Sequence, residues 1–257
     1  MRAHTITWKM PAMCISGPAE KDGEWWPASL RKLKLGRGFN SSVDGVLWPT
    51  SLEELKFGWD FDQPVDRVRW PVSLRSLTFG YSFDQPIDKV TWPASLEQLT
   101  LGLRFNQQLD KVKWPASLRQ LSFGRTFDQP IADVAWPSSL RQVSFGWGFN
   151  QSVGGVSWPT SLQQLTFKLH FNQPILDAIW PPSLEQLTFG RDFNQAIEGV
   201  AWPAALRELT FGESFNQPVQ EVDWPGSLRM VTFGKEFDQP IDALEGRGIE
   251  VIVLRRS

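Results

Sequence analysis

"SLEELKFGWDFDQPVDRVRWP", residues Ser51–Pro71, decides the fold because a closely related stretch, "SLRSLTFGYSFDQPIDKVTWP", follows at Ser73–Pro93. The same step of 22 residues separates ten tryptophans that each precede a proline: Trp26, Trp48, Trp70, Trp92, Trp114, Trp136, Trp158, Trp180, Trp202 and Trp224. It also separates ten phenylalanines that each precede Asn or Asp: Phe39, Phe61, Phe83, Phe105, Phe127, Phe149, Phe171, Phe193, Phe215 and Phe237. A fixed period of this length indicates a solenoid, in which each unit stacks on its neighbours.

Each unit contains a short strand pattern. Leu55 and Phe57 alternate with polar residues, as expected for one face of a strand, and Gly58 ends the run. A second extended segment is predicted at 68–70, where Pro71 stops it. No window predicts a helix of useful length. We therefore expect an all-β, right-handed parallel β-solenoid of ten 22-residue coils with terminal caps.

The residues that stay constant from unit to unit predict the packing. The apolar set is expected to point inward in columns: Leu52, Leu55, Phe57, Phe61, Val65, Val68 and Trp70. The glycine after the strand suits a corner that needs either positive φ or close backbone approach; Lys168 replaces it in one unit. The Asx residue after each phenylalanine is expected to satisfy backbone amides at the next corner, as a ladder along the stack.

The motif Phe171-Asn172-Gln173-Pro174-Ile175, with the Trp-Pro-x-Ser-Leu-x-x-Leu-x-Phe-Gly pattern, resembles the FNIP repeat, a 22-residue relative of the leucine-rich repeats. The resemblance covers about 26–244 and implies a non-catalytic solenoid used for protein interaction. Trp-Pro stands where the family often has Ile-Pro or Leu-Pro. We expect an N-terminal cap at 1–25, the repeats at 26–245, and a capping strand within 246–257, at 249–254.

Composition limits the partners. The 26 basic and 28 acidic residues give a formal charge of −2, so there is no overall attraction to nucleic acid or anionic membranes. The single cysteine, Cys14, has no intrachain disulfide partner, and no apolar run is long enough for a membrane span. We expect an intracellular, cytoplasmic protein that binds neither nucleic acid nor a membrane interior.

Candidate binding residues lie in the two variable positions after each corner glycine. This pair of positions carries aromatic and arginine residues, which are frequent anchors of recognition. The predicted partner-binding residues are Trp59, Tyr81, Arg104, Arg125, Trp147, His170 and Arg191. The alternative interpretation is that these are weakly constrained loop positions. The expected partner is a protein; a glycan, or a role in surface assembly, is the alternative.

A second candidate surface is the outward strand face, where Thr and Ser alternate with Gln and could suit a regularly spaced ligand such as ice or a polysaccharide. Thr also pairs well with itself across strands, so this ladder has a structural explanation. We expect no enzyme activity, cofactor or metal. Only His4 and His170 are present, and the recurring Ser and Asp residues fit corner contacts better than a catalytic or calcium site.

Overall fold

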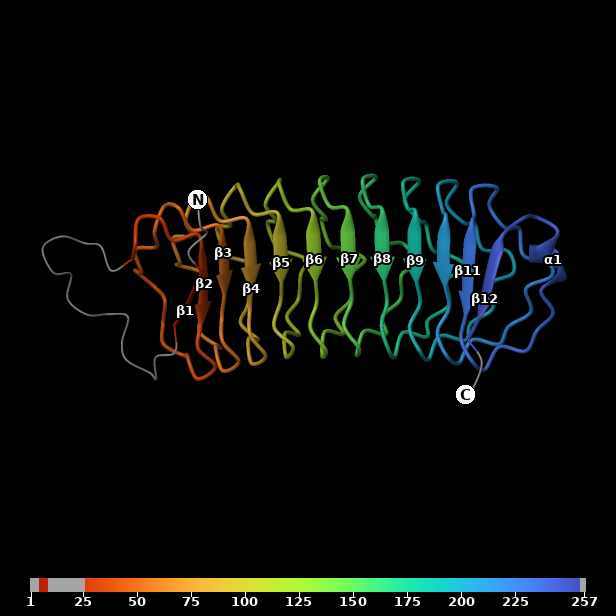
Figure 1. Ribbon diagram of the computed structural model, residues 1–257, viewed down its shortest axis with the longest axis horizontal. Helices are drawn as coiled ribbons and strands as arrows, with labels where there is room; N and C mark the ends of the chain where they lie inside the picture. Colours follow the sequence, from red (N-terminus) through yellow and green to blue (C-terminus); the bar gives the residue numbers. More distant parts are fainter. Residues whose placement is uncertain (1–4, 9–25, 255–257) are drawn as a thin grey trace, which may run out of the picture.

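The computed structural model describes residues 5–8 and 26–254 and shows one twelve-stranded sheet in which every strand is parallel to its neighbours and the order follows the sequence (Figure 1). The strands are β1 Thr5–Trp8, β2 Lys32–Leu35, β3 Glu54–Lys56, β4 Ser76–Thr78, β5 Gln98–Thr100, β6 Gln120–Ser122, β7 Gln142–Ser144, β8 Gln164–Thr166, β9 Gln186–Thr188, β10 Glu208–Thr210, β11 Met230–Phe233 and β12 Glu250–Val253. The all-β parallel solenoid predicted from the 22-residue period is confirmed.

The strands pair in a register set by the repeat. Leu55 lies opposite Leu77, which lies opposite Leu99, so equivalent residues of successive coils are direct neighbours. The middle residue of each three-residue strand is buried, and the residues beside it face outward. Because side chains alternate across a strand, this register keeps one face of the sheet apolar along the whole rod.

The second extended segment differs from the prediction. Residues 68–70 form no strand; a turn at 66–67 precedes them, and the amide of Val68 donates to the carbonyl of Val65 within the same coil, at 3.3 Å. The backbone N–H of Val68 thus donates within its own coil, and Pro71 has no backbone N–H to donate. The spacing of the apolar residues at 68–70 reflects side chains that point inward, although the segment belongs to no second sheet.

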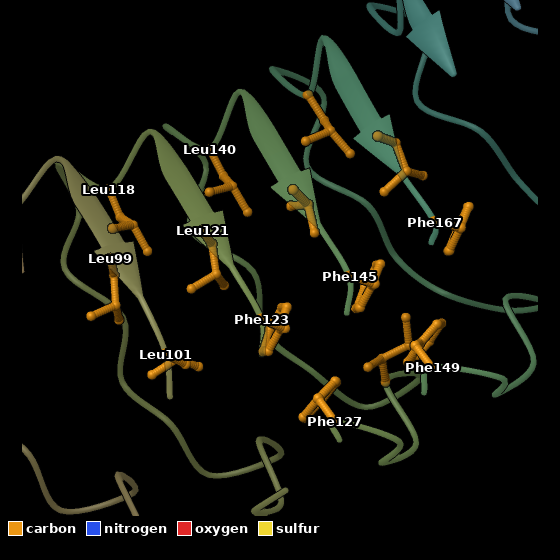
Figure 2. Close-up of a cluster of buried hydrophobic side chains, with 14 of the residues drawn as sticks. Leu99, Leu101, Leu118, Leu121, Phe123, Phe127, Leu140, Phe145, Phe149 and Phe167 are labelled. Carbon is orange, nitrogen blue, oxygen red and sulfur yellow. The ribbon is translucent and has the colours of Figure 1, made fainter. Parts of the chain in front are cut away.

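The core is a set of columns along the rod. All seven residues predicted to point inward are buried. Figure 2 shows Leu99 and Leu121, or Phe127 and Phe149, at equivalent places in neighbouring coils. The phenylalanine rings are stacked, with centroids 3.9 Å apart for Phe57 and Phe61 within one coil. This burial depends on the adjacent coils, so a single coil is not expected to fold alone.

The tryptophan column closes the core on another side. Trp70 and Trp92 lie 6.4 Å apart with nearly parallel planes, and Trp70 meets Phe57 edge to face. The indole N–H groups of nine tryptophans are buried without a hydrogen-bond partner among the described residues: Trp48, Trp70, Trp92, Trp114, Trp136, Trp158, Trp180, Trp202 and Trp224. An unpaired buried donor costs about 1–3 kcal/mol, which the burial of large rings must offset.

Two polar ladders tie the coils together. The side-chain oxygen of Asp62 accepts the amide of Asp84 at 2.9 Å and the side-chain amide of Gln85 at 2.9 Å, and this pattern recurs along the Asx column. The predicted Asx ladder is confirmed. The hydroxyl of Ser73 likewise donates to the carbonyl of Leu52 at 2.7 Å, as in most coils. These side chains bind groups of an adjacent coil, so their role is structural.

The corner glycines are required by close approach. A Cβ atom on Gly58 would lie 1.7 Å from the carbonyl oxygen of Gly36, and one on Gly80 would lie 1.7 Å from that of Gly58. The described glycines with positive φ are Gly45, Gly155, Gly199 and Gly248, none of which belongs to this column. Of the two explanations offered for the corner glycine, close backbone contact between coils is therefore the right one.

At the C-terminal end, a four-residue helix, α1 (Asp242–Glu245), precedes β12, which pairs in parallel with β11. At the other end β1, within the expected N-terminal cap at 1–25, pairs with β2. The remaining N-terminal residues, Cys14 included, lie outside the described residues. Across 5–8 and 26–254, no helix is long and apolar enough to cross a membrane.

Candidate functional site

The variable pairs after the corner glycines form one column. The amide of the second residue of each pair donates to the carbonyl of the first residue one coil earlier: Ser82 to Trp59 at 2.9 Å, and Arg104 to Tyr81 at 2.9 Å. Nine such bonds run from Arg37 to Glu236. We call this column of ten pairs, from 37–38 to 235–236, the post-glycine stripe. The backbone ladder places its members along one corner of the rod, one coil apart.

Four side chains at one end of the stripe stack on each other. The rings of Trp59 and Tyr81 are parallel to within 3°, with centroids 4.3 Å apart. The guanidinium carbon of Arg37 lies 5.2 Å from the Trp59 ring centroid, and that of Arg104 lies 5.4 Å from the Tyr81 ring centroid. Because the four residues come from four successive coils, each ring lies between two neighbours.

A third cation–π pair follows along the same column. The guanidinium carbon of Arg125 lies 4.8 Å from the ring centroid of Trp147, the next coil's residue. Leu103 lies between Tyr81 and Arg125 in the column. Trp59, Leu103 and Trp147 are exposed, Trp59 and Trp147 by 45% and 46%. Cation–π contacts of this kind hold exposed side chains in defined positions.

The other end of the stripe is held by ion pairs. Nδ1 of His170 lies 2.7 Å from a carboxylate oxygen of Asp192, and Nε of Arg191 lies 3.7 Å from the other oxygen. Lys235 pairs with Glu213 at 2.7 Å. Charges in this half therefore meet opposite charges inside the stripe.

The structure thus divides the predicted binding residues into three groups. Trp59, Tyr81 and Arg104 share one stack, Arg125 and Trp147 form the next pair, and His170 and Arg191 meet at Asp192. Arg37 and Asp192 were not among the predicted binding residues. The available signal was the repeat itself, because each lies 22 residues from a predicted residue, Trp59 or His170.

The second candidate surface, the outward strand face, is partly engaged in contacts along the rod. The side-chain amide of Gln142 donates to Gln164 at 2.5 Å, and that of Gln186 donates to Glu208 at 3.0 Å. Near β3 the face is charged: Glu54 contacts the ammonium groups of Lys32 and Lys56. Hydrogen bonds from the two lysines lower the pKa of Glu54, and the same carboxylate raises the pKa of Lys32.

The recurring polar residues are engaged in contacts between coils. The Asp side chains of the Asx column accept amide hydrogens from the next coil, and the Ser hydroxyls donate to carbonyl groups. Within the described part of the chain, no group of three or more His, Cys, Asp or Glu side chains could hold a metal ion.

The parallel sheet, the Leu-x-x-Leu-x-Phe strand unit and the stacked coils define a leucine-rich-repeat-like solenoid. The model of the FNIP Repeat family matches residues 61–104, 105–148, 149–192 and 171–214, which together span more than half of the chain. The chain therefore belongs to the FNIP repeat family.

Solved structures agree with this assignment. CroV588, described as a circular leucine-rich-repeat protein, is 39% identical over 88% of this chain, with a TM-score of 0.81. TLR13 in complex with ssRNA13 (14% identity, 88% of this chain, TM-score 0.62) and an internalin, inlF, from Listeria monocytogenes (12%, 89%, 0.54) share the fold. The match covers 34%, 36% and 73% of those chains. No curated protein matches the chain.

Proposed function

We propose that the protein is a non-catalytic repeat scaffold that recognises another protein through the post-glycine stripe. A role as an interaction scaffold agrees with the repeat family and the fold. One observation carries the choice of surface: the stripe holds the stacked aromatic and arginine side chains of Arg37, Trp59, Tyr81 and Arg104, which project from a rigid backbone ladder. Aromatic and arginine anchors fixed before binding lose little side-chain entropy in a complex.

A comparison of capture by three forms of the protein tests this proposal. The stripe variant, Trp59→Ser/Tyr81→Ser/Trp147→Ser, removes three aromatic side chains. The matched control, Leu47→Ser/Val72→Ser/Ile179→Ser, removes three apolar side chains that are 70%, 79% and 72% exposed outside the stripe. Each form is first checked for folding by circular dichroism. It is then immobilised and exposed to extract of the source cells.

We expect the wild type and the control variant to retain the same partner protein and the stripe variant to lose it. Retention by all three forms would mean that the stripe is ordinary surface. Loss from both variants would indicate non-specific apolar binding, and either result contradicts the proposal.

Assembly of copies into a larger structure is a second candidate, favoured by the end of the sheet. Among the described residues, no strand pairs with the outer edge of β12, where Ile252 and Leu254 are exposed. An open parallel edge is able to accept a further strand. Mass photometry of the purified protein tests this candidate. Assembly requires multimers whose fraction rises with protein concentration, and the Ile252→Lys substitution should reduce that fraction.

A further inference from the structure

We infer that the half of the post-glycine stripe from Arg37 to Trp147 binds an acidic, extended segment of a partner protein. The inference rests on the proposed function and adds the chemistry of the partner. It depends on which parts of the stacked side chains remain accessible, on their charge, and on their spacing along the rod.

The rings of Trp59 and Tyr81 each have stacked neighbours from both adjacent coils. Trp59 lies between Arg37 and Tyr81, and Tyr81 lies between Trp59 and Arg104. Stacking of a nucleic-acid base requires an open aromatic face, and so does the packing of a sugar ring on an aromatic side chain. The contacts of Trp59 and Tyr81 with their neighbours compete with stacking by a base or a sugar ring, which disfavours a single-stranded nucleic acid or a glycan as the ligand at these two residues.

The edges present hydrogen-bond donors. A guanidinium group, an indole N–H and a phenol O–H all donate. Among the described residues, the indole of Trp59 and the hydroxyl of Tyr81 form no hydrogen bond, and the guanidinium groups of Arg37, Arg104 and Arg125 contact no carboxylate. A row of unused donors is complementary to carboxylate oxygens.

Charge separates this half of the stripe from the other. Among the stripe pairs from 37–38 to 147–148, three guanidinium groups without a carboxylate partner stand against one carboxylate, that of Asp60. The carboxylates of Asp62, Asp84 and Asp128, two residues from the stripe in the Asx column, accept amide hydrogens from the next coil. Beyond it, His170 and Arg191 share Asp192, and Lys235 pairs with Glu213. Within the stripe, the guanidinium groups that have no carboxylate partner thus lie between Arg37 and Arg125.

Spacing points to an extended chain. Paired strands lie about 4.8 Å apart, so Arg104 lies at least about 14 Å and Arg125 at least about 19 Å along the rod from Arg37. An extended peptide advances about 3.3 Å per residue and points alternate side chains to one face. Carboxylates at positions i, i+4 and i+6 of such a peptide lie on one face at about 13 Å and 20 Å, close to the spacing of the three arginines.

Fluorescence anisotropy with labelled peptides tests the inference on the full-length protein. The probe is a serine peptide with glutamates at i, i+4 and i+6. The comparison peptides carry glutamine at those positions, or glutamates at i, i+3 and i+5. An oligothymidylate with the same number of charges represents a generic polyanion. We expect the probe to bind at about 50 mM NaCl, to weaken at about 300 mM, and to bind more tightly than all three comparisons.

Variants locate the binding. Arg104→Gln/Arg125→Gln is expected to weaken probe binding at least about tenfold, as loss of two charge-assisted contacts should. Arg119→Gln/Arg141→Gln removes the same charge from two exposed strand-entry arginines and is expected to change binding less than about twofold. Equal weakening by both variants, or equal binding of the probe and any comparison ligand, would overturn the inference.

The two proposals can fail separately. If no acidic peptide binds but capture from extract still depends on Trp59, Tyr81 and Trp147, the inference is wrong and the proposed function stands with a partner of different chemistry. If the stripe variant retains every partner, the proposed function itself is wrong.

Discussion

The indole of Trp59 lies flat on the ring of Tyr81, with planes within 3° and centroids 4.3 Å apart. Aromatic pairs contribute about 0.5–1.5 kcal/mol beyond their area. A double-mutant cycle with Trp59→Leu and Tyr81→Leu should give a coupling free energy toward the lower end of that range, measured by urea unfolding. The control cycle pairs Trp59→Leu with Trp147→Leu, four coils away, and should be additive. Equal coupling in both cycles would show that the contact has no energetic role.

Close approach at the corners predicts a large difference between two glycine substitutions. Gly80→Ala places a methyl group against the backbone of Gly58 and should lower stability by more than about 2 kcal/mol. Gly226→Ala meets nothing within 4 Å and serves as the control, with little change in Tm. Differential scanning fluorimetry compares the two variants; similar Tm values would contradict the role assigned to the corner.

Lys168 occupies the corner position that is glycine in the other coils, so its replacement by glycine should raise the stability of the protein. Its neighbours in the column are glycines, and a Cβ at the equivalent Gly146 would lie 1.6 Å from a carbonyl oxygen. Lys168→Gly should raise the Tm because relief of this crowding exceeds the entropy cost of a glycine, about 0.5–1 kcal/mol. A lower Tm would mean that the corner has fully adapted to the side chain.

Ala205 interrupts the serine ladder at the one described coil interface where the equivalent hydroxyl is missing. Ala205→Ser should donate to the carbonyl of Leu184, as Ser183 donates to that of Leu162 at 2.7 Å, and stabilise by about 0.5–1.5 kcal/mol. Ser183→Ala should lose a similar amount in urea unfolding. The exposed neighbour provides the control, since Ala204→Ser gains no such partner and should be neutral.

The bridging role of Glu54 between Lys32 and Lys56 predicts a pH dependence. The pKa of Glu54 is lowered in the folded state by the two lysines, so its stabilising contribution is present above the unfolded-state pKa and is lost as the pH falls through the folded-state pKa. Glu54→Gln should therefore lower the Tm near neutral pH and have a smaller effect at about pH 3. A constant Tm difference across this range would exclude the ion pairs as its cause.

Much of the fold can be predicted from the sequence, because residues 22 positions apart become direct neighbours in adjacent coils. Once Leu55 is assigned to a strand, its partner must be Leu77, and the inward columns and the Asx ladder follow from the 22-residue step. Residues 68–70 were misread because inward-pointing apolar side chains produce the same alternation with or without a strand.

The details of the candidate site could be predicted less well. The sequence placed Trp59 and Tyr81 one coil apart, but the choice between stacked and separate rings depends on side-chain rotamers, for which spacing carries no signal. The pairing of His170 with Asp192 also requires both side chains to lean along the rod. The division of the stripe into a stacked half and an ion-paired half emerges only from the assembled coils.

The ladders that join each coil to the next imply that the length of this protein is free to evolve. Every described coil presents nearly the same carbonyl, Asx and glycine contacts to its neighbour, so removing or duplicating 22 residues in the middle would rejoin matching surfaces. Such an event would leave the scaffold intact while moving Arg125 closer to or farther from Arg37. Loss or gain of whole repeats in the gene would thus change the length of ligand that fits the stripe, without any substitution in the binding residues.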